Sequence, residues 1–301
     1  MFRRTIITGA AALFLAPAAH AEMVTHSMGE TEVPDDPQRV IVLTNEGTEA
    51  VLALGVTPIG AANSWNGDPW YDHIAEAMSG VEPVGKESAV NLELVAALEP
   101  DLILGNKQRH EEIYGQLSAI APTVLSERLR GDWMVNFALY AEALGREAVG
   151  EAVMEGFRAN VAATSEALGD SLAEEVSIIR FLASQIRIYQ KDSFSGVLLD
   201  QLGFARPENQ DVDEFALRVG KESIPDMYGD RIFHFTWDNG NGEGIAAAED
   251  ALADPLWLSL SAVEAGRVHA VSDAIWNTAG GVLAARLMLD DIATIYGVAM
   301  N

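Results

Sequence analysis

The chain has 301 residues, of which 49% are apolar and 21% are charged, a balance that is typical of a globular protein. Because that length exceeds what one compact core usually takes, we expect two lobes. The 45 acidic residues outnumber the 19 basic ones and give a formal net charge of −26, which disfavours nucleic acid as a partner. There is no cysteine, which excludes disulfides, thiolate catalysis and cysteine-based zinc sites, and we expect no lipid anchor.

The first 21 residues have the pattern of an export signal. Arg3 and Arg4 precede an apolar stretch over residues 6–16, and an Ala-His-Ala sequence ending at Ala21 offers a cleavage site. The alternative is a membrane anchor, but the stretch is shorter than the roughly 20 residues of a spanning helix. The paired arginines resemble a twin-arginine signal only weakly, so the general export route is favoured. We expect cleavage after Ala21, a mature net charge of −26 minus 2, or −28, and a soluble, monomeric periplasmic protein.

Residues 22–144 predict a first α/β lobe. An apolar run at 40–43 is followed by a polar turn and by a helix that ends at Gly55, and the run is apolar on both faces, as in a buried parallel strand. The alternation recurs, with strands at 59–62, 101–105 and 123–125 and helices at 91–98 and 111–118. Strands that alternate with helices predict a mostly parallel sheet.

A proline-free segment rich in Ala, Glu and Leu runs from about residue 133 to residue 168. Gly145 divides it, and we expect one long connecting helix within 145–169. A second lobe is predicted over 170–301, with strands at 176–182, 187–189, 231–235 and 267–271 and a last helix at 281–296.

The two halves resemble each other. The segment LGVTP at 54–58 matches LGFARP at 202–207, and a glutamate precedes an aspartate by eight residues in each half, Glu93 before Asp101 and Glu222 before Asp230. The fold expected is two similar α/β lobes joined by one long helix, with a cleft between them. Loops at the carboxyl ends of both sheets should line that cleft.

Enzyme and metal motifs find little support. Residues 169–172 spell the GDSL string of a hydrolase family, but the string ends a helix in mid-chain and no DxxH supplies a base. A secreted α/β hydrolase that depends on Ser171 is therefore the less favoured alternative. The histidines of the mature chain have no metal-ligand spacing, so we expect no metal bound directly by the protein.

The segment NLELVAALEPDLI at 91–103 strongly resembles the signature of periplasmic binding proteins for iron-siderophores, haem and vitamin B12. Segments at 107–114, 120–124, 187–207 and 254–296 resemble the iron-siderophore branch, so the resemblance covers essentially the whole mature chain. It implies two Rossmann-like lobes joined by a rigid long helix, with small lobe movement on binding. The implied function is to capture a ferric siderophore of citrate, hydroxamate or catecholate type for the permease and ATPase of an ABC importer. Haem or cobalamin is the alternative ligand, and Tyr71, His73 or Tyr189 would then be the candidate axial ligands of haem.

Arginines and aromatic residues are the candidate ligand-binding residues. Guanidinium groups match the anionic oxygens of a ferric siderophore, and Trp and Tyr offer flat contact area with a polar tip. The candidates are Arg109, Arg128, Arg180, Arg187, Tyr189, Trp65, Trp70, Trp237 and Trp276. Each has a structural alternative, either a surface ion pair or a side chain that fills a gap. We expect no cofactor, and iron held only within the siderophore.

Glu93 and Glu222 hold equivalent positions in the two halves. In the family that the chain resembles, glutamates at such positions dock onto arginines of the membrane permease, so the resemblance implies docking here. The alternative is an acid placed in a first helical turn by the helix dipole.

Overall fold

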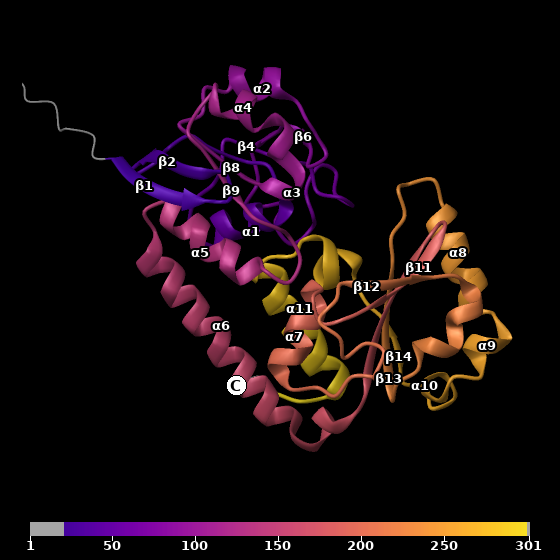
Figure 1. The fold of residues 1–301 in the computed structure, drawn as a ribbon. Coiled ribbons are helices and arrows are strands. Elements are labelled where there is room, and N and C mark those ends of the chain that lie inside the picture. The colour runs from indigo at the N-terminus through magenta and orange to yellow at the C-terminus, as the bar shows by residue number, and fades with distance from the viewer. Residues whose placement is uncertain (1–20, 300–301) are drawn as a thin grey trace, which may run out of the picture.

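The computed structural model describes residues 21–299, so nearly all of the predicted export signal lies outside it. Figure 1 shows two lobes with helix α6 (Glu147–Leu168) running along one side from the first to the second. Each lobe contains a five-stranded sheet and helices, which confirms the predicted α/β class with two lobes. No helix within residues 21–299 is long and apolar enough to cross a membrane.

The first sheet is parallel throughout, in the strand order β5-β4-β3-β8-β9. Its strands are β3 (Val40–Val42), β4 (Gly60–Ala61), β5 (Glu82–Pro83), β8 (Leu102–Asn106) and β9 (Thr123–Ser126). Its helices are α1 (Asn45–Ala53), α2 (Leu92–Ala97), α3 (Lys107–His110), α4 (Tyr114–Ser118) and α5 (Trp133–Ala143), with a 3₁₀ turn at Glu111–Ile113. Two hairpins add β1 (Ala21–His26) with β2 (Gly29–Pro34), and β6 (Gly85–Lys86) with β7 (Ala89–Val90). Every residue of β3, β8 and β9 is buried, as their apolar sequences predict.

The second sheet is mixed, in the order β12-β11-β10-β13-β14. Its strands are β10 (Val176–Leu182), β11 (Gln185–Tyr189), β12 (Ala216–Val219), β13 (Arg231–Thr236) and β14 (Val268–Ala270). Strand β10 pairs in parallel with β13, and β13 pairs in parallel with β14. On the other side, β10 pairs antiparallel with β11, and β11 pairs antiparallel with β12. The parallel sheet predicted for residues 22–144 is therefore found in the first lobe, whereas the second sheet is only half parallel, so the two lobes are less similar than expected. Only two residues separate β10 from β11, and so short a link can join only antiparallel strands.

Helices of several kinds complete the second lobe. They are the 3₁₀ helices η2 (Gly169–Ala173) and η3 (Lys221–Met227), the π-helical turn η4 (Ala274–Thr278), and α7 (Phe194–Leu202), α8 (Glu243–Leu252), α9 (Pro255–Leu258), α10 (Ser261–Glu264) and α11 (Val282–Tyr296).

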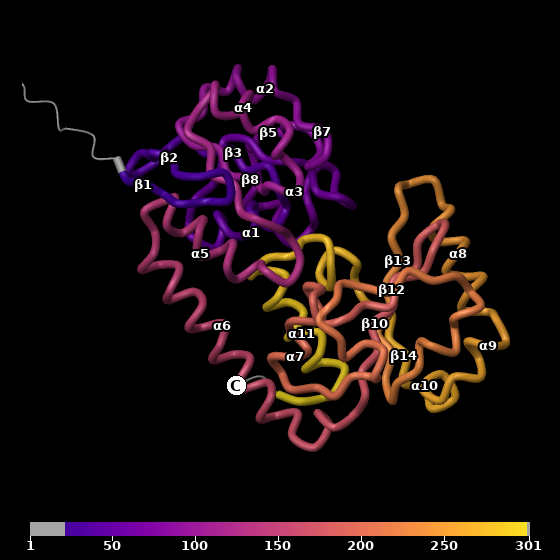
Figure 2. Tube along the Cα trace, in the orientation of Figure 1, coloured from indigo at the N-terminus to yellow at the C-terminus, as the bar shows by residue number. Residues whose placement is uncertain are grey.

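Helix α11 makes a second connection between the lobes. It packs against α1 and α6, and the backbone N–H of Ala284 donates to Oε2 of Glu49 on α1 over 2.9 Å. Figure 2 shows this C-terminal segment, in yellow, in the region between the two lobes. The largest apolar cluster joins Val42 and Phe137 of the first lobe to Phe233 and Met288 of the second. Because the core is continuous, the two lobes are packed as one body and not only tethered by α6.

Candidate ligand-binding site

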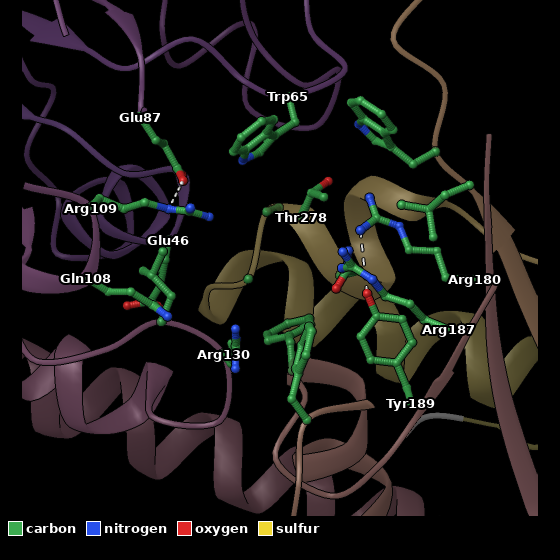
Figure 3. Close-up of a pocket in the computed structure, with 18 of the residues that line it drawn as sticks. Glu46, Trp65, Glu87, Gln108, Arg109, Arg130, Arg180, Arg187, Tyr189 and Thr278 are labelled. Carbon is green, nitrogen blue, oxygen red and sulfur yellow. Dashed lines mark hydrogen bonds and ion pairs between the residues drawn. The ribbon is translucent and has the colours of Figure 1, made fainter. Parts of the chain in front are cut away.

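A cavity of about 410 Å³ lies between the lobes. In the first lobe its lining comes from α1, from the loop after β4, from the β6–β7 turn, from α3 and from the loop after β9. In the second lobe it comes mainly from β10, β11, β12 and η4. Figure 3 shows Arg109, Glu87 and Glu46 on one side, and Arg180, Arg187 and Tyr189 on the other. The cavity is thus built where the connections at the strand ends of the first lobe face the antiparallel edge of the second sheet.

Three arginines form a row across three adjacent strands of the second sheet. Arg180 on β10 pairs in register with Arg187 on β11, and Arg187 pairs with Arg218 on β12. Directly opposed residues on neighbouring strands point to the same face, and all three line the cavity. We call these three residues the arginine row.

One member of the arginine row has a carboxylate partner. Nε of Arg180 lies 2.7 Å from Oδ1 of Asp273, and its Nη2 donates to Oδ2 over 3.1 Å. Asp273 also accepts from Thr278 and from Asn66, a residue of the first lobe, at 3.2 Å each. Within the described part of the chain, neither Arg187 nor Arg218 forms an ion pair, and the buried Nε of Arg187 has no hydrogen-bond partner. The row therefore has uncompensated positive charge at the cavity.

Phe215, which precedes β12, lies under two of the cavity arginines. The guanidinium carbon of Arg130, from the loop after β9, is 3.9 Å from the ring centre, and that of Arg187 is 5.8 Å away. Arg130 has a φ of +87°, a left-handed conformation that a non-glycine residue adopts only under constraint. Desolvation by burial lowers the pKa of Arg130 from its usual value. An arginine of the first lobe thus stacks on an aromatic ring of the second.

The wall from the first lobe mixes positive and negative groups. Nε of Arg109 is 3.5 Å from Oε2 of the buried Glu87, and its guanidinium lies 5.8 Å from the ring centre of Trp65. Oε1 of Glu87 accepts from the backbone and the side chain of Asn45, each over 2.8 Å. His110, fully buried behind this wall, lies 3.0 Å from the carbonyl of Glu87 through Nε2 and accepts from the N–H of Asn106 at Nδ1. Burial lowers the pKa of His110 to about 4, so the ring is neutral and positions the Glu87 segment.

Six of the nine predicted ligand-binding residues line the cavity: Arg109, Arg180, Arg187, Tyr189, Trp65 and Trp237. Tyr189 is fully buried, stacked edge-on against Phe215, with its hydroxyl 3.5 Å from Nη1 of Arg180. The buried Tyr189 side chain therefore contacts Arg180 of the arginine row from the protein interior.

The remaining three predicted residues do not line this cavity. Arg128 pairs with Asp132 and Asp192 and lines a separate acidic depression. Trp70 is buried in the core, and Trp276 is fully buried, with its indole N–H donating to Asp291 over 2.8 Å. Arg128 therefore serves in ion pairs, and Trp70 and Trp276 serve in core packing, which are the structural alternatives to ligand binding given for these residues.

Among the lining residues that the sequence reasoning missed are four charged ones, Glu46, Glu87, Arg130 and Arg218, and the aromatic Phe215 on which Arg130 stacks. Arg130 is two residues beyond the predicted Arg128, in the same loop, so extending that loop would have included it. Arg218 lies on the unpredicted β12, whose four residues are too few to show a pattern.

The two predicted docking residues lie on different lobes. Glu93 is exposed in the first turn of α2, and Glu222 is exposed in the first turn of η3. Both positions suit either docking or a helix-dipole role. No group of three or more His, Asp or Glu residues that could hold a metal ion occurs within residues 21–299.

A sequence model of the periplasmic binding protein family matches residues 40–274. The chain therefore belongs to that family, which confirms the resemblance inferred from its sequence, and it is a substrate-binding protein and not an enzyme.

The particular relatives are named for the small molecules that they bind. The chain is 48% identical over 282 residues to the "Probable siderophore-binding lipoprotein YfiY" of Bacillus subtilis, covering 91% of this chain and 87% of that protein. It is 33% identical over 270 residues to the "Achromobactin-binding periplasmic protein" of Dickeya dadantii, covering 87% and 88%. The crystal structure of Staphylococcus aureus SirA complexed with staphyloferrin B superposes with a TM-score of 0.86 at 30% identity, covering 93% of this chain and 100% of that chain. Since YfiY is named a lipoprotein, the comparison does not support the expectation that this chain lacks a lipid anchor.

Proposed function

We propose that this protein captures a ferric siderophore of net negative charge, rich in carboxylate oxygens, in the cavity between its lobes and delivers it to an ABC permease. Relatives named for binding achromobactin and siderophores, and a neighbour solved with staphyloferrin B, support the general class of ligand. The arginine row supports the anionic type.

The observation that best supports an anionic ligand is the strand register that places Arg180, Arg187 and Arg218 opposite one another on β10, β11 and β12. Like charges directly opposed on neighbouring strands repel each other, so the arrangement opposes folding and suits the binding of an anion. Guanidinium groups hold carboxylates through paired charge-assisted hydrogen bonds, which neutral hydroxamate oxygens match less well.

Iron, in this proposal, enters the cavity only as part of the siderophore. The cavity presents guanidinium groups, which repel a bare cation and attract an anionic chelate. Trp65 and Trp237 supply apolar contact to the scaffold of the chelate.

Export and docking complete the proposal. Residues 1–21 would direct the chain across the inner membrane to the compartment in which the Dickeya relative is named. Glu93 and Glu222, one exposed on each lobe, would contact arginines of the permease.

The test is a titration of the purified protein, followed by tryptophan fluorescence, because Trp65 and Trp237 line the cavity. The ligands are ferric citrate, ferric staphyloferrin B, a neutral ferric trihydroxamate, haem and cyanocobalamin. We expect saturable quenching at micromolar or lower concentration with a carboxylate-bearing ferric chelate. A preference for the trihydroxamate would contradict the anionic ligand, and binding of haem or cobalamin alone would contradict the siderophore.

A further inference from the structure

Glu46 is a buried carboxyl group in a cavity proposed to hold an anion. It lies in the first turn of α1, lines the cavity, and is only 5% exposed. Nδ2 of Asn136 donates to its Oε1 over 2.7 Å. Across residues 21–299, no cation lies within ion-pair distance of Glu46 and no donor reaches its Oε2.

The groups around Glu46 mostly oppose a negative charge on it. Three carboxyl groups face it, from its own helix, from the β6–β7 turn and from the residue before α5: Glu49, Glu87 and Asp132. The hydroxyl of Tyr140 on α5 lies nearby, and Arg109 and Arg130 are the cations on the same side of the cavity.

Two features favour ionisation of Glu46, namely the hydrogen bond from Asn136 and the amino-terminal end of α1. A helix end contributes about 0.3–1 kcal/mol, which is less than the cost of burying a carboxylate without a cation. Desolvation by burial is the largest cause, and it raises the pKa of Glu46 well above its usual value.

The chemistry of the cavity leads to the same protonation state. A carboxylate at Oε2 would repel the anionic oxygens that the arginine row attracts, whereas a protonated carboxyl would present an O–H donor to them. Because Oε1 already accepts from Asn136, the proton belongs on Oε2, the oxygen without a partner.

We propose that Glu46 binds the ligand as a neutral carboxylic acid, donating a hydrogen bond from Oε2 to a ligand oxygen. The proposal rests on the function proposed above and adds a specificity-determining residue to it. Loss of the proton removes a donor and places a negative charge beside the ligand, so affinity falls as the pH rises.

The test compares Glu46→Gln with the wild type. A glutamine keeps an oxygen for Asn136 and supplies a permanent N–H donor in place of the acid. Dissociation constants for ferric citrate and ferric staphyloferrin B are measured from about pH 6 to about pH 9, and the ratio between the two proteins cancels any titration of the ligand. The control is Glu112→Gln, an exposed acid outside the cavity.

We expect Glu46→Gln to bind within about twofold of the wild type at the low end of this range, and to bind more tightly than the wild type at any pH at which Glu46 loses its proton. Binding by Glu46→Gln that is about tenfold weaker or worse at every pH would overturn the proposal, because that result indicates a carboxylate that accepts a hydrogen bond from the ligand.

A second readout needs no ligand and separates the two proposals. The infrared spectrum of the free wild-type protein at neutral pH should contain the carbonyl band of a protonated carboxylic acid that Glu46→Gln lacks. Its absence refutes the neutral acid even if siderophores bind. Its presence without any siderophore binding refutes the function of the cavity as proposed, and with it the role of Glu46 toward a ligand.

Discussion

Arg187 has another arginine directly opposite it on each side, Arg180 on β10 and Arg218 on β12. Each opposed pair of like charges costs on the order of 0.2–1 kcal/mol. The carboxylate of Asp273 relieves this repulsion at Arg180 alone. The remaining repulsion at Arg187 and Arg218 destabilises the fold, and an anion bound against the arginine row relieves it.

Two histidines, the buried His110 and the partly buried His234, make the stability of the fold depend on pH. Burial lowers the pKa of His110 and of His234 from 6.5 to about 4. The unfolded chain therefore binds protons at a higher pH than the folded chain does. The stability contributed by the neutral rings is complete above about pH 6.5 and is lost progressively as the pH falls toward 4.

We predict that His234→Phe weakens this pH dependence. His234 packs edge-on against Phe181 and Trp257, its buried Nδ1 has no partner within residues 21–299, and it lies outside the cavity. Between about pH 7 and pH 5, the free energy of unfolding should fall by about 2 kcal/mol less in the variant than in the wild type. Urea denaturation at both pH values measures this difference. Equal losses in the two proteins would show that His234 titrates normally in the fold.

Helix α6 depends on glycine at one position and not at another. A Cβ on Gly150 would lie 2.8 Å from Cβ of Ala141 on α5, whereas a Cβ on Gly156 would meet nothing within 4 Å. Gly150 thus allows α5 and α6 to approach closely, while Gly156 only weakens the helix.

The two glycines form a matched pair of substitutions. Gly156→Ala should raise the free energy of unfolding by about 0.5–1 kcal/mol through helix propensity. Gly150→Ala should lower it by about 1–3 kcal/mol, because overpacking at α5 outweighs the same propensity gain. Thermal unfolding of both variants tests the packing, and stabilisation by both would contradict it.

The sequence predicts those elements whose burial leaves a pattern. The apolar runs of β8 and β10, and the amphipathic stripe of α6, identified these elements to within one or two residues. Strand β12 has two exposed residues among its four and leaves no such pattern.

The site was less predictable, because its charge balance depends on residues far apart in the sequence. Arg128 lies 64 residues from Asp192, with which it pairs, and Arg180 lies 93 residues from Asp273. The register that aligns Arg180, Arg187 and Arg218 follows from strand pairing, which the sequence does not specify.

At the scale of the whole molecule, the lobes share a core and two helical connections, α6 and α11. The cavity lies between lobes that are packed as one body, and its two walls differ in character. The second lobe contributes the arginine row, while the first contributes Arg109, Trp65 and two buried carboxyl groups. A ligand that fits both walls presents its anionic oxygens toward β10, β11 and β12.

The most direct test of this account is the affinity of Arg187→Ala and Arg218→Ala for the carboxylate-bearing ferric siderophore that the wild type binds most tightly. Arg146→Ala is the control of equal charge, since Arg146 lies at the start of α6 beside Asp36. We predict a loss of about 10- to 100-fold in Arg187→Ala, whose buried Nε would pair with the ligand, a smaller loss of about two- to fivefold in Arg218→Ala, whose side chain is exposed, and less than a twofold change in the control. Unchanged affinity in both row variants would contradict the arginine row as the anion-binding element of this protein.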